Sequence, residues 1–131
     1  MAEDIGAPAP ASDSFIPIAE LQPSCSSAKA IRSVVALLWP YSASNKSITL
    51  LLVEPDFRLR RNKGQVRVEF HGSSAKEVAS SGICIGDEVV LSLESGGWER
   101  EEAGLRTPGT GVDWKLSFGE KLSMQVCYRD F

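Results

Sequence analysis

The chain has 131 residues, 43% of them hydrophobic and 24% charged, which is the size and composition of one globular domain with a single core. Its formal net charge of -3 excludes a protein that is basic over its whole surface, although it is compatible with a local basic patch. Three widely spaced cysteines, Cys25, Cys84 and Cys127, fit neither a disulfide framework nor a metal clip and predict reduced thiols.

The N-terminal part predicts a tail followed by a buried strand. Residues 1–14 combine prolines with small and acidic residues, and this composition cannot bury enough surface to become ordered. We therefore expect a disordered tail before a single domain over residues 15–131. Residues 30–39 carry apolar side chains on both faces, which is typical of a long, curved strand buried within a barrel. The loop that follows, with Tyr41 and Lys46, is expected at one end of that barrel.

The centre of the sequence predicts a cationic hairpin. Residues 47–54 form a short apolar run and residues 65–71 alternate apolar with polar side chains, so both predict strands. Basic and aromatic side chains fill the connection between them and continue onto the outward side of the second strand: Phe57, Arg58, Arg60, Arg61, Lys63 and Arg67. Cations mixed with aromatic rings on a sheet are typical of a surface that binds a nucleic-acid backbone with stacked bases.

The C-terminal half predicts one helix and further strands. Residues 73–81 contain capping hydroxyls and helix-forming residues. Alternating apolar residues predict strands over residues 87–94 and 112–118, with a last strand over residues 122–128. The long segment 95–111 is rich in glycine and lacks periodicity, which predicts a loop of the kind that tends to carry function.

This order of elements predicts an all-β protein with an OB-fold, a five- to six-stranded Greek-key barrel with one short helix between strands three and four. In that fold, single-stranded nucleic acids bind across strands two and three and between the loops after strands one and four. The cationic hairpin would supply strands two and three, and residues 95–111 would supply the loop after strand four.

Four separated blocks of the sequence, in the expected order, also carry a family resemblance: Val34–Ser42, Leu51–Arg61, Val66–Ala75 and Gly86–Leu93. Over about residues 15–126 the chain resembles the first OB domain of fungal telomere end-binding, protection-of-telomeres proteins. The resemblance implies binding of G-rich, single-stranded telomeric DNA in a groove of stacked bases, without catalysis. It also implies a nuclear protein of the telomeric region that protects chromosome ends together with other telomere-complex proteins.

The candidate nucleic-acid-binding residues are the cations of the hairpin and the rings and basic groups beside it: Tyr41, Lys46, Phe57, Arg58, Arg60, Arg61, Lys63, Arg67, His71 and Trp98. Tyr41 and Trp98 lie in the two loops that flank the groove and are the favoured stacking residues, whereas Phe57 is left open between stacking and packing. Trp39 ends a buried strand and is expected in the core. The basic cluster has a simpler alternative, because cations at a hairpin tip also increase solubility and protect a sheet edge.

Motifs for catalysis and metal binding are absent from the sequence. The sole histidine, His71, has no cysteine or carboxylate at metal-ligand spacing, and no nucleophile elbow, phosphate loop or zinc-protease motif occurs. We therefore expect no enzyme activity, no catalytic residue, no metal, no cofactor and no small-molecule substrate. No apolar run approaches the ~18 residues that cross a bilayer, so a membrane partner is not expected either.

The alternative function is a protein-interaction module of a telomere or genome-maintenance complex that does not bind DNA directly. Barrel folds keep their shape when the groove takes a different partner, and the acidic segment 94–102 favours this alternative. The two functions predict different surfaces. A groove for single strands should show a continuous positive strip from Lys46 through Arg58, Arg61 and Arg67 with exposed rings, whereas a peptide groove should show an exposed apolar patch.

Overall fold

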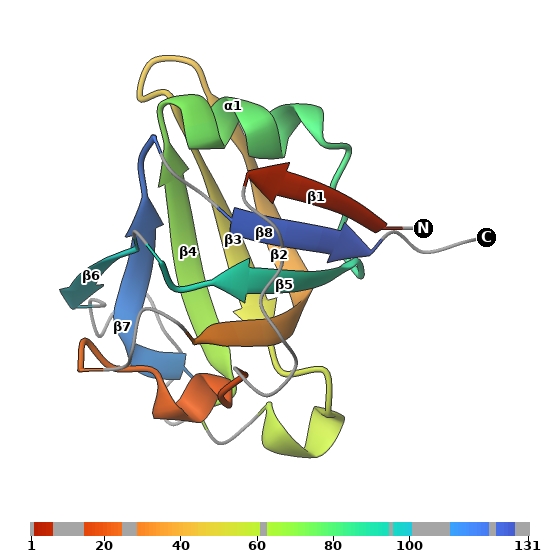
Figure 1. The fold of residues 1–131 in the computed structure, drawn as a ribbon, viewed down its shortest axis with the longest axis vertical. Coiled ribbons are helices and arrows are strands. Elements are labelled where there is room, and N and C mark those ends of the chain that lie inside the picture. Colours follow the sequence, from red (N-terminus) through yellow and green to blue (C-terminus); the bar gives the residue numbers. More distant parts are fainter. Residues whose placement is uncertain are drawn as a thin grey trace.

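The protein is mostly β-strand with one short α-helix, as expected for an all-β protein (Figure 1). The structure is a computed structural model, and it describes residues 2–6, 15–24, 29–60, 63–94, 96–100, 111–120 and 123–127. The strands within these ranges are β1 (Ala2–Gly6), β2 (Ala30–Ser42), β3 (Ser47–Val53), β4 (Gln65–His71), β5 (Glu88–Ser92), β6 (Gly97–Arg100), β7 (Gly111–Phe118) and β8 (Ser123–Cys127). The helices are α1 (Ser73–Ser80) and two short 3-10 turns, η2 (Ile18–Glu20) and η3 (Phe57–Leu59).

The described strands form one sheet in the order β1-β8-β5-β2-β3-β4-β7-β6. β2 pairs with β3 on one side and with β5 on the other, both antiparallel. β4 and β7 are parallel. In Figure 1 the strands β1, β8 and β5 cross in front of β2 and β3, and the sheet curls around the buried core.

Alternation along the strands explains how this curled sheet fills its interior. In β4 every second side chain is buried, and Phe70 stacks on Phe118 of β7 with ring centroids 5.7 Å apart. The helix α1 lies across one end of the sheet (Figure 1) and buries Ala75 and Val78. The sequence predicts strands in which apolar and polar residues alternate, and a helix with one apolar side. The structure confirms, to within a few residues, the elements predicted over 30–39, 47–54, 65–71, 73–81, 87–94, 112–118 and 122–128.

A β-bulge in β2 reverses which side chains face the core. The pairing of β2 with β3 shifts between Val35 and Leu37, which inserts one residue into β2. Val35, which lies before the bulge, is buried, whereas Leu37 and Trp39, which lie after it, are 47% and 36% exposed. The prediction that Trp39 belongs to the core is wrong, because a single inserted residue moves every later side chain of a strand to the opposite face.

The sheet is larger and more open than the predicted barrel. Hydrogen bonding among the described strands ends at β1 on one edge and at β6 on the other, so a closed ring of strands is not formed. Ala2–Gly6 pairs with β8 where the sequence predicts a disordered tail, while residues 7–14 lie outside the described ranges. Strands pair through backbone hydrogen bonds, which require no particular side chains. The composition of residues 1–14 therefore does not predict this pairing.

Part of the predicted loop 95–111 is also strand. Gly97–Arg100 forms β6 and pairs antiparallel with β7, and this pairing places Trp98 opposite Leu116. Residues 101–110 lie outside the described ranges. The two strands beyond the expected six are therefore β1 and β6, both at edges of the sheet.

Candidate functional site

Two residues of the predicted site, Arg67 and His71, lie on the side of β2, β3 and β4 that points away from the core. We call this surface the outer face, and it consists of Leu37, Trp39, Thr49, Leu51, Arg67, Glu69 and His71. The burial of the alternate residues in β3 and β4, such as Leu50 and Val68, turns these side chains outward. Within this surface the β-bulge adds the two exposed apolar residues of β2.

Register brings Trp39 and Arg67 together across β3. Trp39 pairs with Thr49, which pairs with Glu69, so Arg67 lies one diagonal step from the ring. The guanidinium carbon of Arg67 is 4.9 Å from the centroid of the Trp39 ring. A cation over an indole face is attracted to the ring and restricts its rotation, so the outer face presents an ordered aromatic platform.

Charges on the outer face are paired into a network centred on Glu69. Lys115 of β7 donates to Glu69 over 2.7 Å and lies 3.1 Å from the carboxylate of Glu99. Nε2 of His71 lies 3.3 Å from the other oxygen of Glu69. Burial lowers the pKa of Lys115, but its bonds to the two glutamates outweigh burial and hold that pKa above its ordinary value. Lys115 is therefore a fixed cation whose charge these acids offset.

The connection between β3 and β4 uses its arginines to build its own structure. Arg58 donates from Nε and Nη2 to the two carboxylate oxygens of Asp56, at 3.2 Å and 3.1 Å. The backbone N–H of Arg58 also donates to Asp56, so the pair forms a turn, and these bonds lower the pKa of Asp56. Nε of Arg60 donates to the backbone carbonyl of Glu54 over 2.6 Å. Side chains predicted to bind phosphate thus stabilise the loop.

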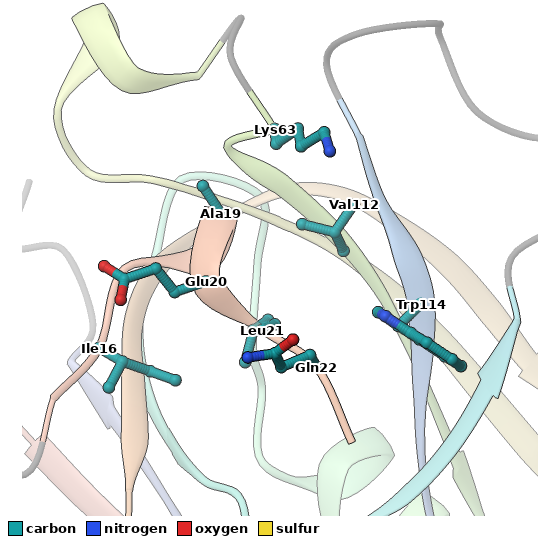
Figure 2. A pocket seen from close by; sticks show the side chains of 8 residues that line it. All are labelled: Ile16, Ala19, Glu20, Leu21, Gln22, Lys63, Val112 and Trp114. Carbon is teal, nitrogen blue, oxygen red and sulfur yellow. The ribbon is translucent and has the colours of Figure 1, made fainter. Parts of the chain in front are cut away.

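The two lysines of the predicted site lie in the turns that precede β3 and β4. Lys46 and Lys63 both have left-handed backbones, with φ of 52° and 54°. Lys46 is exposed beside β3, and its carbonyl accepts the N–H of Gly72. Lys63 lines a pocket of about 400 Å³ in which it lies with Val112 and Trp114 on one side, opposite Ile16 and Glu20 (Figure 2). Lys63 is thus at the end of the sheet and not on the outer face.

The predicted stacking residues are only partly available. Tyr41 and Trp98 are half-buried and pack against the hydrophobic core, which ties their rings to the stability of the domain. Arg61 lies outside the described residues, and for Phe57 only the backbone of η3 is described. The structure therefore brings together Arg67 and His71 from the predicted set, and it separates them from Lys63 and Trp98.

Sequence reasoning missed the exposed apolar residues beside this site. Within the described ranges, Ile85 is 61% exposed, and it precedes Gly86, whose N–H bonds the carbonyl of Val35 just before the bulge. Ile85 and Leu37 thus flank the same part of β2.

The continuous positive strip expected from Lys46 through Arg58, Arg61 and Arg67 stays a prediction, because Arg61 lies outside the described residues. Asp56 binds Arg58, and Glu69 and Glu99 offset Lys115 beside the outer face. The outer face therefore presents a cation over an aromatic ring, with exposed aliphatic side chains beside it. Across the described ranges, no group of histidine, cysteine and acidic side chains could hold a metal ion, and no helix is long and apolar enough to span a membrane.

Comparison with known proteins identifies one family. The family model described as Domain of unknown function (DUF8502) matches residues 11–130, which is nearly the whole chain. No curated protein matches the sequence.

Proposed function

Because the chain belongs to this domain family, whose description names no activity, we propose a function from the geometry of the outer face: the protein binds single-stranded DNA. The observation that carries the proposal is the guanidinium of Arg67 over the exposed ring of Trp39. Single-strand binding proteins combine aromatic platforms for bases with cations for phosphates, and arginine adds to the stacking. The proposed function requires no catalytic step.

The proposed fold is an OB-fold in which β2, β3, β4, β5 and β7 are the five strands of the barrel. Three features support it: β2 pairs with both β3 and β5, the helix α1 lies between β4 and β5, and β2 is long and bulged. The outer face of β3 and β4 then corresponds to the strands two and three that bind oligonucleotides in this fold. The strands β1, β6 and β8 extend the sheet at its edges.

Binding would place a base on Trp39 while nearby cations contact the phosphates. Each stacked base contributes about 1–3 kcal/mol in such sites. In this proposal Arg67 on the outer face and the exposed Lys46 in the adjoining turn contact the phosphates. With two to three phosphate contacts at ~0.7 each, the slope of log affinity against log salt should be about -2.

The resemblance noted in the sequence extends the proposal to a biological setting. We place the protein in the nucleus at chromosome ends, with G-rich telomeric DNA as its strand and other telomere-complex proteins as its partners. The blocks that carry this resemblance include β2 around Trp39 and β4 around Arg67, the two elements on which the proposed site depends.

A protein-interaction module is the second candidate, and the exposed apolar residues favour it. Leu37 and Ile85 are aliphatic, and the pairing of acids with bases on the outer face leaves little net charge to attract phosphate. A surface of this kind suits a partner with apolar side chains.

Fluorescence anisotropy with labelled 18-nucleotide strands tests the proposal. We expect binding of single strands at 50 mM salt, weaker binding at 200 mM salt with a slope of about -2, and much weaker binding of the matching duplex. Binding that does not change with salt, or no binding at 50 mM salt, contradicts the proposed function and favours the protein-interaction module.

A further inference from the structure

The strand β1 is an addition at one edge of the sheet. Among the described strands it pairs only with β8, in a register that runs from Ala2 opposite Cys127 to Gly6 opposite Ser123. Figure 1 shows β1 beside β8 at the rim of the fold. β1 also lies outside residues 11–130, the part of the chain that matches the domain family. The edge on which it lies, β8, is within that part.

The sequence of β1 is a poor strand former. Four of its five residues are alanine, glutamate, aspartate and glycine, which are all depleted in strands. The order of this segment therefore depends on the hydrogen bonds that β8 supplies. Terminal segments held in this way open at low free energy, whereas central strands open only when the domain unfolds. Withdrawal of β1 should thus cost far less than unfolding.

Withdrawal of β1 would leave β8 as an uncovered edge. On its other side β8 pairs with β5, and its side chains Met124 and Val126 are buried in the core. The strand is therefore held in place by the rest of the domain. An edge strand presents a row of unpaired N–H and C=O groups, which is a template for pairing with another strand.

The residues of β8 allow this edge to pair with the same edge of a second copy. A two-fold axis perpendicular to the sheet keeps the buried sides of the two strands level, and the antiparallel register that pairs all five residues places this axis at Gln125. Met124 then lies opposite Val126 of the second copy, and the two Gln125 residues face each other. Apolar groups meet apolar groups, and each amide can donate to the other and accept from it.

The opposite edge of the sheet lacks this self-complementarity. β6 has four residues, and the antiparallel register that pairs all four sets Trp98, on the core side, against Glu99, on the outer side. A shift of one residue restores the sides but leaves three pairs. Either Glu99 then faces a second Glu99, with repulsion between like charges, or it faces Gly97.

We propose that β1 is a releasable cover that keeps the protein monomeric, and that chains from which β1 has withdrawn dimerise by antiparallel pairing of β8 with β8. The inference goes beyond the proposed binding of single-stranded DNA and does not depend on it. One sheet would continue through both copies. The paired edge is short, so the dimer should be weak and should form only at high protein concentration.

The variant Glu3→Pro/Asp4→Pro withdraws β1 within the full chain. Successive backbone N–H groups point to opposite sides of a strand, so one of the two prolines removes a donor that faces β8. Sedimentation equilibrium should give a monomer for the parent, whereas the mass of the variant should rise toward the dimer between about 10 µM and about 1 mM. Ala9→Pro/Ala11→Pro adds two prolines outside β1 and should stay monomeric.

Substitutions at Gln125 test the register of the dimer. Gln125→Lys added to the double-proline variant should restore the monomer, because two like charges would face each other across the axis. In a chain whose native cysteines are replaced by serine, Gln125→Cys with the two prolines should form a disulfide-linked dimer under mild oxidation, since opposite Cβ atoms lie about 4.5–5.5 Å apart. Gln125→Cys without the prolines should crosslink far more slowly, because β1 covers the edge.

Each remaining outcome overturns the inference. A double-proline variant that stays monomeric up to about 1 mM shows that the β8 edge does not pair with itself. A dimer that Gln125→Lys leaves intact, or a parent that is already dimeric, uses another surface. Loss of the folded circular dichroism spectrum in the double-proline variant also overturns it, because a strand that the domain needs for folding is not a releasable cover.

Discussion

Arg67 of β4 lies over the ring of Trp39 of β2, with its guanidinium carbon 4.9 Å from the ring centroid, although β3 separates the two strands. The contact exists because the bulge before Leu37 turns Trp39 outward and the antiparallel register sets Arg67 one diagonal step away. An exposed tryptophan held in place by a cation loses less conformational freedom when a base stacks on it. This pair is therefore the centre of the proposed binding face.

Trp39→Ala should weaken binding of a single strand by about 1–3 kcal/mol and leave the salt slope unchanged, since a stack contributes affinity without neutralising phosphate. Anisotropy titrations at several salt concentrations measure both quantities. Trp98→Ala is the control, because Trp98 packs against the core and its loss should lower the melting temperature more than the affinity. A larger effect of Trp98→Ala on the affinity than on the melting temperature would indicate that Trp98 is the stacking residue.

Releasing Arg58 from Asp56 should strengthen binding. Asp56→Asn removes the partner that neutralises Arg58, so a further cation becomes available and the salt slope should steepen by about 0.7. Arg58→Ala in the parent should change the slope by less than the ~0.7 of one phosphate contact, because Arg58 is already paired within its loop. A loss of the full ~0.7 would show that Arg58 leaves Asp56 to bind phosphate.

Glu54→Gln should stabilise the protein near neutral pH. Burial raises the pKa of this carboxyl in the folded state above its unfolded value, so the folded state binds the proton more tightly. Stability from this group is therefore present at low pH and is lost as pH rises through the folded-state pKa. Each tenfold difference in proton affinity corresponds to about 1.4 kcal/mol.

The measurement is urea unfolding of the parent and Glu54→Gln between pH 4 and pH 8. The variant should gain free energy of unfolding relative to the parent as pH rises above the ordinary glutamate range, and the difference should then level off. Glu77→Gln, on the exposed side of α1, is the control for the removal of one negative charge. A difference that stays constant over the whole range would mean that Glu54 has the same pKa folded and unfolded.

Gly64→Ala should destabilise the domain. A Cβ at Gly64 would collide with the carbonyl oxygen of Leu59 and would lie 2.7 Å from Cα of Arg60, and both are backbone atoms that cannot rotate aside. Overpacking of this kind costs about 1–3 kcal/mol, which lowers the melting temperature of a domain this size by several degrees.

Gly119→Ala is the matched control for this substitution. A Cβ there meets no atom within 4 Å, so its melting temperature should stay close to that of the parent. Equal melting temperatures for the two variants would contradict the close approach of Gly64 to Leu59.

Local patterns in the sequence were sufficient to predict the strands of the central sheet and the helix. Val66, Val68 and Phe70 alternate with polar residues, and only a strand buries such a set on one side. The same periodicity placed Arg67 and His71 outward. These assignments depend on local patterns, which act within a single element and require no knowledge of its neighbours.

Tertiary structure alone decided which side chains reach the candidate site. Trp39 faces outward because one inserted residue shifts the pairing with β3, and the pattern of apolar residues on both faces of β2 concealed that shift. Asp56 binds Arg58, and the backbone carbonyl of Glu54 accepts a hydrogen bond from Arg60. The positive charge of this cluster is therefore partly offset in the folded protein. Charge pairing and strand register depend on distances between segments far apart in the chain, and these distances are fixed only when the whole sheet has folded around its core.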